Sequence, residues 1–599
     1  MRKKRLLFYG TLLLVIVAVA GVGLFRLIEY AIQQANPLET AFEQAANESQ
    51  VPLALLKAVA YSETRFDMHN LQGNTVGPGA YGIMNVVNSK KTPDPMGRAA
   101  KALGISPLKI KTDAATNIRA GAVLLKEYAL QLSPKKTLPT SLNGWRGAVA
   151  LYEGARYSYV VNLYVTTVYK AIQNGFKVQT ASGETIELAA QPVNTQSLTN
   201  SELPALAKMP AGCTTQDTQN NQVDYPGAVN CILNPAQHDC DKVPGTNAPC
   251  NYFPDTRPKD FDISQVVIHD IEGNAARALS AFLNPDSTAA SHYIVGSDGT
   301  VYQVIHDHDV AFHAANLWYN QHSIGIEHEG YATSGNVWYT SATYQASAKL
   351  TAYLAQKYNI PLEHDHIVAH GTVQAPTLSG IPNHVDPGQY WQWDYYLNLI
   401  HQQGVAYPQT PANKHLLSLH LPANAPFDTS NFFYLYNSPK LDADNLLPQV
   451  ANSTDTTDET NTVEAATSYY YLDKKPDEHG FGIMMYQIWY GESSNAHKNP
   501  SDQFMHARLA WLAVPEGLAS EGQGIAVKLH STDGKPIPIS GSPKTNTATT
   551  DYHIGDAPDG AIFVSAYSVP GDKTVSQWYE INYNHRQAWV PDSAVEIVS

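Results

Sequence analysis

The chain has 599 residues, a formal net charge of −15, 43% hydrophobic residues and 16% charged residues. At roughly 100–200 residues per domain, this length predicts several domains of ordinary globular composition and excludes a disordered or fibrous chain. The acidic balance argues against nucleic-acid binding through phosphate neutralisation, and binding to an anionic polymer would have to come from specific sites.

Residues 1–30 carry a targeting signal. A basic cluster at residues 2–5 precedes an uncharged apolar run from Leu6 to Phe25. A run of ~20 residues spans the ~30 Å hydrocarbon core of a bilayer as a helix, and its basic flank stays in the cytoplasm. We therefore expect a membrane anchor that places the rest of the chain on the extracellular side of the cell membrane, at the cell wall. Residues 18–20 (Ala-Val-Ala) also fit a signal-peptidase site, so a cleaved and secreted form stays open.

Residues 38–175 predict an all-α domain. Leu53, Leu56 and Val59 recur at helical spacing, and residues 117–132 and 160–172 repeat the pattern. This spacing is typical of helices that bury one face.

Residues 176–260 are rich in polar residues and proline and show little periodicity, which predicts a linker. The chain's four cysteines all lie within it, at positions 213, 231, 240 and 250. An even, clustered set in an exported chain predicts two disulfides, with three pairings open. A structural zinc site is the alternative, although no Cys-x-x-Cys pair is present.

Residues 261–405 alternate strand and helix patterns, which predicts an α/β domain. The β-branched run 265–269 and the strands 292–295 and 300–305, joined by a glycine-containing turn, precede an apolar-striped helix over 343–358. Histidines stand where two of the predicted strands end: His269 and His370.

Amide hydrolysis with zinc needs three protein ligands, an open position, and a carboxylate that removes a proton from water. His269, His370 and Asp386, the last in a His-Val-Asp-Pro-Gly turn, are candidate ligands. Their residue types alone do not select them from the other histidines of the domain.

Six short segments, in order, resemble the N-acetylmuramoyl-L-alanine amidase family that includes the T7-lysozyme-like amidases and the peptidoglycan recognition proteins. They are residues 267–273, 291–293, 311–314, 323–327, 369–371 and 386–388. The resemblance implies a central mixed sheet, a Zn²⁺ cofactor, and cleavage of the amide between N-acetylmuramic acid and L-alanine of the peptidoglycan stem peptide. The alternative is a zinc-retaining module that binds peptidoglycan without cutting it.

The same resemblance implies residue roles. His269, His370 and Asp386 match the zinc ligands, and Glu327 matches the carboxylate that activates water. Three further residues match less closely: His384 stands where many relatives carry an oxyanion-stabilising Lys, His313 resembles a substrate-pocket histidine, and Glu329 replaces Glu327 if the register is shifted.

The helical region resembles lysozyme-like lytic transglycosylases in residues 79–85, 117–121 and 150–154. The resemblance implies that Glu63 is the single acid/base catalyst, that Tyr152 binds substrate, and that the product is a 1,6-anhydro sugar. Asn85 and Glu153 depart from the family pattern in the groove. An inactive glycan-binding domain is the alternative.

The C-terminal region contains a repeated strand pair, residues 486–490 with 506–512 and residues 578–582 with 586–591. The repeat predicts two small β-barrels. Residues 520–599 resemble a bacterial SH3-like domain, and residues 425–515 fit a diverged copy that would help to bind the wall. For the whole chain we predict a multidomain peptidoglycan hydrolase; the alternative is a non-catalytic peptidoglycan-binding or sensing scaffold.

Overall fold

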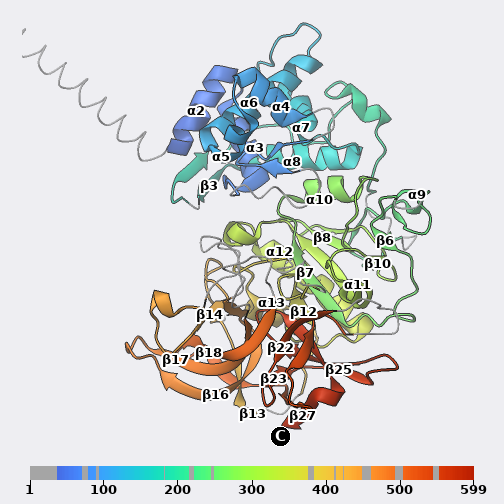
Figure 1. Ribbon diagram of the computed structural model, residues 1–599. Helices are drawn as coiled ribbons and strands as arrows, with labels where there is room; N and C mark the ends of the chain where they lie inside the picture. The colour runs from blue at the N-terminus through green and yellow to red at the C-terminus, as the bar shows by residue number, and fades with distance from the viewer. Residues whose placement is uncertain are drawn as a thin grey trace, which may run out of the picture. The chain divides into compact units, whose positions relative to one another are not determined.

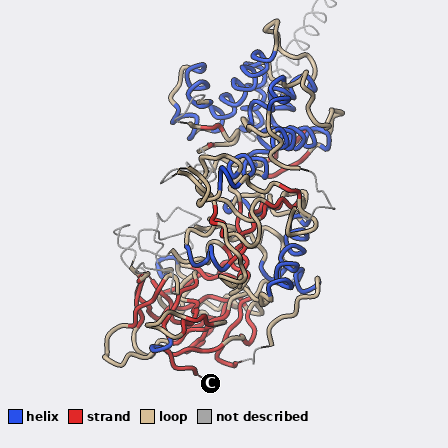
Figure 2. The backbone as a smooth tube through the Cα atoms, turned by 90° about the vertical axis from the view of Figure 1, so that its right-hand side faces the viewer, coloured by secondary structure: helices blue, strands red, loops and turns tan. Residues whose placement is uncertain are grey.

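The computed structural model of the chain divides into two compact units, residues 1–210 and residues 211–599 (Figure 1). Helix dominates the described part of the first unit, and strand dominates residues 413–598 of the second (Figure 2). The structure describes residues 37–69, 79–89, 94–180, 182–214, 222–244, 248–375, 384–409, 413–422, 424–447, 461–492, 504–543 and 552–598.

The predicted anchor, residues 1–30, lies outside the described residues. Among the helices that are described, none is long and apolar enough to cross a bilayer.

The first unit is built mainly from helices, but the prediction that residues 38–175 are all-α is wrong in one detail: a short antiparallel pair, β1–β2, lies within them, and a second pair, β3–β4, follows α8. α3 packs against α8, and α6 packs against α2 and α7. Local signals set the helix ends: the Asp113 side chain accepts from the Thr116 amide at the start of α6, and Gly104 ends α4 in the left-handed region. The elements are α2 (Pro37–Ser49), α3 (Leu53–Thr64), β1 (Ala80–Tyr81), β2 (Val86–Val87), α4 (Pro95–Leu103), α5 (Pro107–Thr112), α6 (Ala114–Leu132), α7 (Arg146–Glu153), α8 (Ser158–Asn174), β3 (Phe176–Gln179) and β4 (Thr185–Leu188).

The region predicted as one linker, residues 176–260, is divided between the two units. Its first part forms the β3–β4 hairpin and belongs to the first unit, whose limit is Pro210. Its second part lies in the second unit and holds two disulfides, Cys213–Cys231 and Cys240–Cys250. The prediction of two disulfides is therefore confirmed, and the pairing that the sequence left open is sequential.

A six-stranded mixed sheet forms the centre of the second unit, with strand order β12-β7-β11-β8-β9-β5. β12, β7, β11 and β8 run parallel, whereas β9 pairs with β8 antiparallel. The strands are β5 (Val229–Asn230), β7 (Gln265–Asp270), β8 (Tyr293–Val295), β9 (Val301–Gln303), β11 (Ser323–His328) and β12 (Ile367–Ala369). The prediction of an α/β domain with a mixed sheet is confirmed at this level.

Two different layers cover the central sheet. Val266 and Ile268 of β7 pack in one apolar core with α12 (Ser341–Tyr358) and α13 (Trp393–Gln402). Val267, one residue away and therefore on the opposite face, packs in a core that includes Trp318 of α11 (Leu317–His322) and Trp589 from the C-terminal strands. Further short elements of this part include α9 (Pro235–His238), β6 (Tyr252–Phe253), α10 (Ala275–Phe282) and β10 (Val310–Ala311).

The C-terminal strands pack around several apolar cores; twelve of the strands share one hydrogen-bonded network, and β23, β20 and β27 form a separate three-stranded sheet. Both predicted strand pairs are antiparallel hairpins, β17–β18 and β25–β26, and a parallel pairing of β18 with β22 joins the two halves. The strands are β13 (Asn413–Leu419), β14 (Phe432–Tyr436), β15 (Thr462–Glu464), β16 (Ser468–Pro476), β17 (Ile483–Glu492), β18 (Met505–Pro515), β19 (Ala519–Gly522), β20 (Ile525–Leu529), β21 (Ile537–Ser540), β22 (His553–Ala557), β23 (Ile562–Ser565), β24 (Ser568–Pro570), β25 (Gln577–Asn582), β26 (Gln587–Pro591) and β27 (Val595–Val598).

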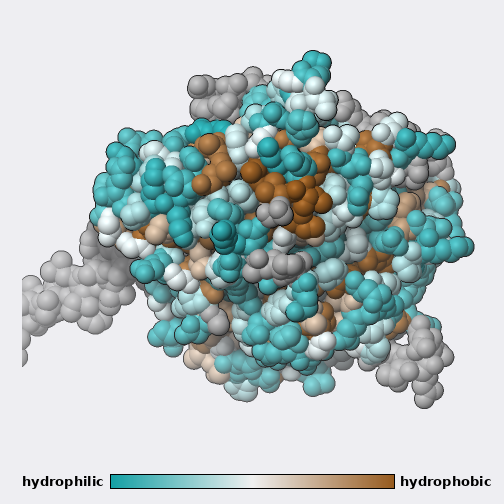
Figure 3. Space-filling model, turned by 90° about the horizontal axis from the view of Figure 1, so that it is seen from below, coloured by the Kyte–Doolittle hydropathy of each residue, from teal (hydrophilic) through white to brown (hydrophobic). Residues whose placement is uncertain are grey.

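The first of these cores includes Leu417 and Leu419 of β13, a strand that starts before the predicted limit of residue 425. Trp578 and Trp589 are buried. The strands also leave some apolar side chains in contact with solvent, among them Leu472 and Ile597, and Figure 3 shows apolar side chains gathered on the face seen from below.

Candidate active site

The candidate site lies where the parallel strands of the central sheet end. His269 on β7 is the direct register partner of Glu327 on β11. His370 follows β12 immediately, and its amide donates to the carbonyl of Ile268 on β7 at 3.0 Å. Because the carboxyl ends of parallel strands lie at one edge of a sheet, residues far apart in sequence converge there.

Three of the predicted residues form a buried cluster. His269, His370 and Asp386 each offer a ligand atom, and these atoms lie within 4.8 Å of one another. The Asp386 carboxylate lies between the two rings, with Oδ2 at 3.2 Å from Nδ1 of His269 and Oδ1 at 3.1 Å from Nδ1 of His370. Nε2 of His370 is buried and has no hydrogen-bond partner among the described residues. Two imidazoles and one carboxylate are a ligand set that suits zinc.

The protonation states of this cluster fit a cation site. Burial lowers the pKa of His370 to about 3 and also lowers the pKa of His269. Burial acts to raise the pKa of Asp386, but His370 and the hydrogen bonds from the histidines outweigh it and hold that pKa well below its usual range. Neutral imidazoles beside an ionised carboxylate are the forms that bind a metal.

Glu327 stands beside the cluster as the predicted carboxylate. It is 7% exposed, and its Oε1 accepts a hydrogen bond of 3.2 Å from the hydroxyl of Ser291. Burial, reinforced by the charge of Asp386, raises the pKa of Glu327 well above its ordinary value. Glu329, the alternative, accepts from the amide of Ser297 in the turn after β8. The geometry therefore favours Glu327 as the carboxylate that faces the cluster.

His313 and His384 flank the cluster on different sides. His313 lies 3.0 Å from His269, measured between Nδ1 and Nε2, and it occupies space that a side chain at Gly325 would fill, since an added Cβ would come within 2.6 Å of its ring. His384 stacks on His370 with 4.1 Å between ring centroids, and its side chain is 41% exposed. Of these residues, His384 has the side chain most exposed to solvent.

Arg586, from the C-terminal strands, is a site-supporting residue that the sequence did not indicate. Its guanidinium is buried and donates to the main-chain carbonyls of Gly371, Val373 and His384. These carbonyls lie beside His370 and Asp386. Hydrogen bonds to backbone carbonyls leave no motif in the sequence, so no pattern could have found this residue.

The helical unit holds a second candidate site around Glu63. The Glu63 side chain, at the end of α3, is fully buried. Its carboxylate accepts from the Asn85 amide at 2.9 Å and from the Tyr164 hydroxyl at 2.5 Å. Asn85 thus touches the predicted catalyst directly. Tyr164 lies on α8, whose sequence shows only the apolar spacing of a buried helix.

Tyr152 and Glu153 form hydrogen bonds with nearby backbone groups in that unit. The Tyr152 hydroxyl donates to the carbonyl of Met84 at 2.6 Å, next to Asn85. The Glu153 carboxylate accepts from the amide of Ala155 in the turn after α7. Tyr152 therefore supports the segment that carries Asn85, and its predicted contact with substrate stays a prediction.

Comparisons with known proteins match the central domain. Residues 259–389 match the N-acetylmuramoyl-L-alanine amidase family. N-acetylmuramoyl-L-alanine amidase A of Achromobacter lyticus is 32% identical over 158 residues, which cover 24% of this chain and 85% of that protein. The 1,6-anhydro-N-acetylmuramyl-L-alanine amidase AmpD of Haemophilus influenzae is 27% identical over 170 residues, covering 24% of this chain and 87% of that protein.

Among solved structures, a selenomethionine AmpD derivative is 24% identical and covers 26% of this chain and 92% of that one, with a TM-score of 0.21. The sequence matches and the buried cluster define the central domain as an amidase-type hydrolase. The chain belongs to the N-acetylmuramoyl-L-alanine amidase family.

Proposed function

We propose that the central domain is a zinc-dependent N-acetylmuramoyl-L-alanine amidase that hydrolyses the amide between N-acetylmuramic acid and L-alanine of the peptidoglycan stem peptide. One observation carries the proposal: the ligand atoms of His269, His370 and Asp386 lie within 4.8 Å of one another, beside Glu327 at the same strand ends. A zinc ion held by the three residues would supply a Lewis acid for the water and for the amide carbonyl.

The chain's own residues supply the proton transfers. Glu327 takes the proton from the attacking water, whose oxygen bonds to the amide carbon. As the carbon–nitrogen bond breaks, Glu327 passes that proton to the nitrogen of the leaving L-alanine. His384, partly exposed and stacked on His370, is placed to donate a hydrogen bond to the developing oxyanion. His313, packed on His269 from the other side, keeps that ring in place and lines the pocket.

The test is digestion of purified peptidoglycan with the full chain, followed by mass spectrometry of the soluble products. We expect free stem peptides from the wild type and their loss in Glu327→Gln, with metal content and binding to peptidoglycan kept. Binding without release of stem peptides by the wild type would instead support a non-catalytic binding or sensing scaffold.

A second activity is favoured by the surroundings of Glu63. We propose that the helical unit is a lytic transglycosylase, because Glu63, which the family resemblance matches to the single acid/base catalyst, has a buried carboxyl group that Asn85 and Tyr164 hold in place by hydrogen bonds. In the same digestion, Glu63→Gln should remove 1,6-anhydro sugars and leave the stem peptides. Anhydro sugars that persist in this variant would exclude the role.

The remaining parts fit a protein that works at the cell wall. We propose that residues 1–30 tether the chain, or direct its secretion, and that the C-terminal strands are SH3-like modules that bind wall peptide or glycan. Two disulfides support an oxidising compartment outside the cytoplasm. Fractionation of cells that produce the full chain, with and without residues 1–30, tests the tether.

A further inference from the structure

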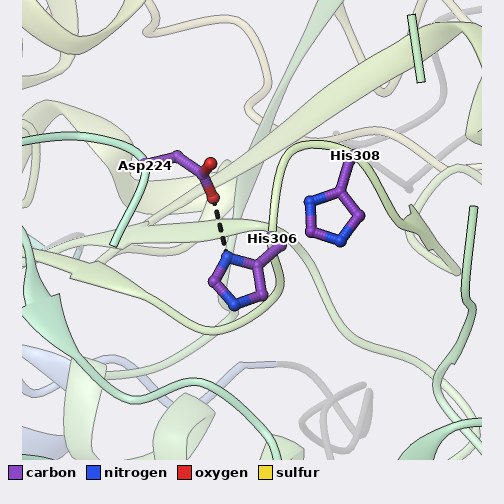
Figure 4. A group of neighbouring side chains, drawn as sticks. All are labelled: Asp224, His306 and His308. Atoms are coloured by element: carbon purple, nitrogen blue, oxygen red, sulfur yellow. Dashed lines mark hydrogen bonds and ion pairs between the residues drawn. The ribbon is translucent and has the colours of Figure 1, made fainter. Parts of the chain in front are cut away.

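A second group of metal-binding side chains lies outside the residues assigned to catalysis. Asp224, His306 and His308 each offer one ligand atom, and these atoms all lie within 4.8 Å of one another. Nδ1 of His306 is 2.9 Å from Oδ2 of Asp224. Figure 4 shows the two imidazole rings beside the carboxylate, each with a nitrogen on the side that faces it.

The carboxylate of this group is held rigidly. The Asp224 amide donates to the side-chain oxygen of Gln303 at 2.6 Å, and the Tyr353 hydroxyl donates to the Asp224 carbonyl at 2.7 Å. Oδ2 of Asp224 also accepts from the Gln303 side-chain amide at 2.6 Å and from the Asp307 backbone amide at 3.2 Å. A metal site needs ligands whose positions are fixed before the ion arrives, and this carboxylate meets that requirement.

The two histidines come from one loop, at positions i and i+2 after β9. Their rings are nearly parallel, with 5.1 Å between centroids. Nε2 of His308 lies 3.5 Å from the carboxylate of Asp309, on the far side of the ring from Nδ1. A carboxylate at the distal nitrogen orients a metal-binding imidazole and raises its basicity.

The local charge also favours a cation. Asp224, Asp307 and Asp309 place three carboxylates near His306, and two cations, Arg257 and Lys357, interact with this group. Nζ of Lys357 is 3.0 Å from Oδ2 of Asp307 and 3.9 Å from Oδ1 of Asp224. Lys357 therefore pairs mainly with the Asp307 carboxylate. The negative charge of Asp224 is less compensated and can attract a metal ion.

We propose that Asp224, His306 and His308 bind a second divalent transition metal, of the zinc type, in a structural site. Two imidazole nitrogens and one carboxylate oxygen match the ligand preference of such ions, and solvent can complete the coordination because the His308 side chain is 49% exposed. The ion joins two segments: the disulfide-bonded loop before β5, which carries Asp224, and the β9–β10 loop, which carries both histidines. It thereby fastens the edge of the central sheet, where β5 pairs with β9.

Metal stoichiometry tests this inference. The purified full chain is stripped with a chelator, dialysed, and titrated with Zn²⁺ in a calorimeter, and bound zinc is then counted by elemental analysis. We expect two equivalents for the wild type, one for the double variant His306→Ala/His308→Ala, and one for His370→Ala, which removes a proposed catalytic ligand. The matched control is His530→Ala, at an exposed histidine 3.3 Å from Asp559, which should retain two equivalents.

A second variant controls for the chance that the double variant misfolds and loses zinc for that reason. Asp224→Asn keeps an oxygen that accepts hydrogen bonds but removes the charge, so it should also bind one equivalent while it keeps the wild-type circular dichroism spectrum. Two equivalents in either variant, or one equivalent in the wild type that His370→Ala abolishes, would overturn the second site. Because His370→Ala tests the central cluster separately, failure of either metal site can be told from failure of the other.

Discussion

Arg586 donates a hydrogen bond from Nη2 to the main-chain oxygen of His384, at 2.7 Å, across about 200 residues of sequence. Its Nη1 donates to the carbonyls of Gly371 and Val373, and the neighbouring amide of Gln587 donates to Thr372 at 2.9 Å. One loop between β25 and β26 thus holds the backbone beside both His370 and Asp386. The loop between β25 and β26 is therefore part of the support of the His269–His370–Asp386 cluster.

Replacing Arg586 should loosen the cluster without removing a ligand. In Arg586→Ala three buried carbonyls lose their donor, which costs about 1–3 kcal/mol for each unsatisfied group. Outer contacts of this kind typically change metal affinity by about 10–100-fold. We expect faster loss of zinc to a competing chelator and a lower kcat, with partial recovery in Arg586→Lys.

The control for this prediction is Arg508→Ala, also in the C-terminal strands. Arg508 forms a partly exposed pair with Glu492 at 2.7 Å, and such pairs contribute little to stability. Zinc retention should therefore match the wild type. Equal zinc loss in the Arg586 and Arg508 variants would show that the effect is general destabilisation and not support of the cluster.

Glu327→Gln should lower kcat for stem-peptide release by about 10²–10⁴-fold, since the amide cannot take a proton from water. Bound zinc and KM should stay near the wild-type values, because Glu327 is not among the ligands of the cluster. The comparison variant is Glu329→Gln, whose side-chain oxygen can still accept from the Ser297 amide. An equal loss of kcat in both variants would contradict the assignment of Glu327.

The pH dependence of stability should reveal the buried imidazole of His585. Burial lowers the folded-state pKa of His585 to about 4, against 6.5 for the ordinary group. Between these values the unfolded chain binds a proton that the folded chain does not. The contribution of neutral His585 to the free energy of unfolding is therefore complete above pH 6.5 and is lost as the pH falls toward 4.

Replacing His585 with Gln should flatten this dependence. Between pH 7 and pH 5, the wild type should lose about 2 kcal/mol more of its free energy of unfolding than His585→Gln does. Denaturation followed by tryptophan fluorescence reports on the second unit, because all but Trp145 of the nine tryptophans lie there. The exposed-site variant His530→Gln should keep the wild-type slope; a wild-type slope in His585→Gln would exclude the buried histidine as its source.

The members of the His269–His370–Asp386 cluster could be predicted from sequence because they lie in short ordered motifs that resemble those of the amidase family, such as residues 267–273 and 386–388. The two disulfides could be counted but not paired, since four cysteines allow three pairings. Arg586 and Tyr164 could not be found. Arg586 recognises backbone carbonyls, which every residue has, and Tyr164 lies on a helix whose apolar spacing explains its position without any site.

The limits of the C-terminal repeats were harder to predict than their hairpins. The strand pairs 486–490 with 506–512 and 578–582 with 586–591 have local patterns, and both form hairpins. β13 lies before the predicted limit. It nevertheless belongs to this region, because it pairs with β16 and β19, which follow it in the sequence by about 50 and 100 residues, respectively. Such long-range pairing depends on which edges are open in the folded sheet, and no local pattern records that.

Tyr164→Phe should reduce the proposed glycan cleavage while leaving the amidase unchanged. The Tyr164 hydroxyl donates to Glu63 at 2.5 Å in a buried setting, so its removal takes away a donor that orients the carboxylate. We expect the yield of 1,6-anhydro sugars to fall by about 10–100-fold, mainly in kcat, because one hydrogen bond to a charged group contributes about 1.5–3 kcal/mol. Tyr169→Phe is the matched control: Tyr169 is on the same helix, and its hydroxyl donates to the Leu142 carbonyl at 2.6 Å, away from Glu63. If both variants lose anhydro sugars equally, helix stability explains the loss, whereas a loss confined to Tyr164→Phe identifies Tyr164 as a residue that positions Glu63.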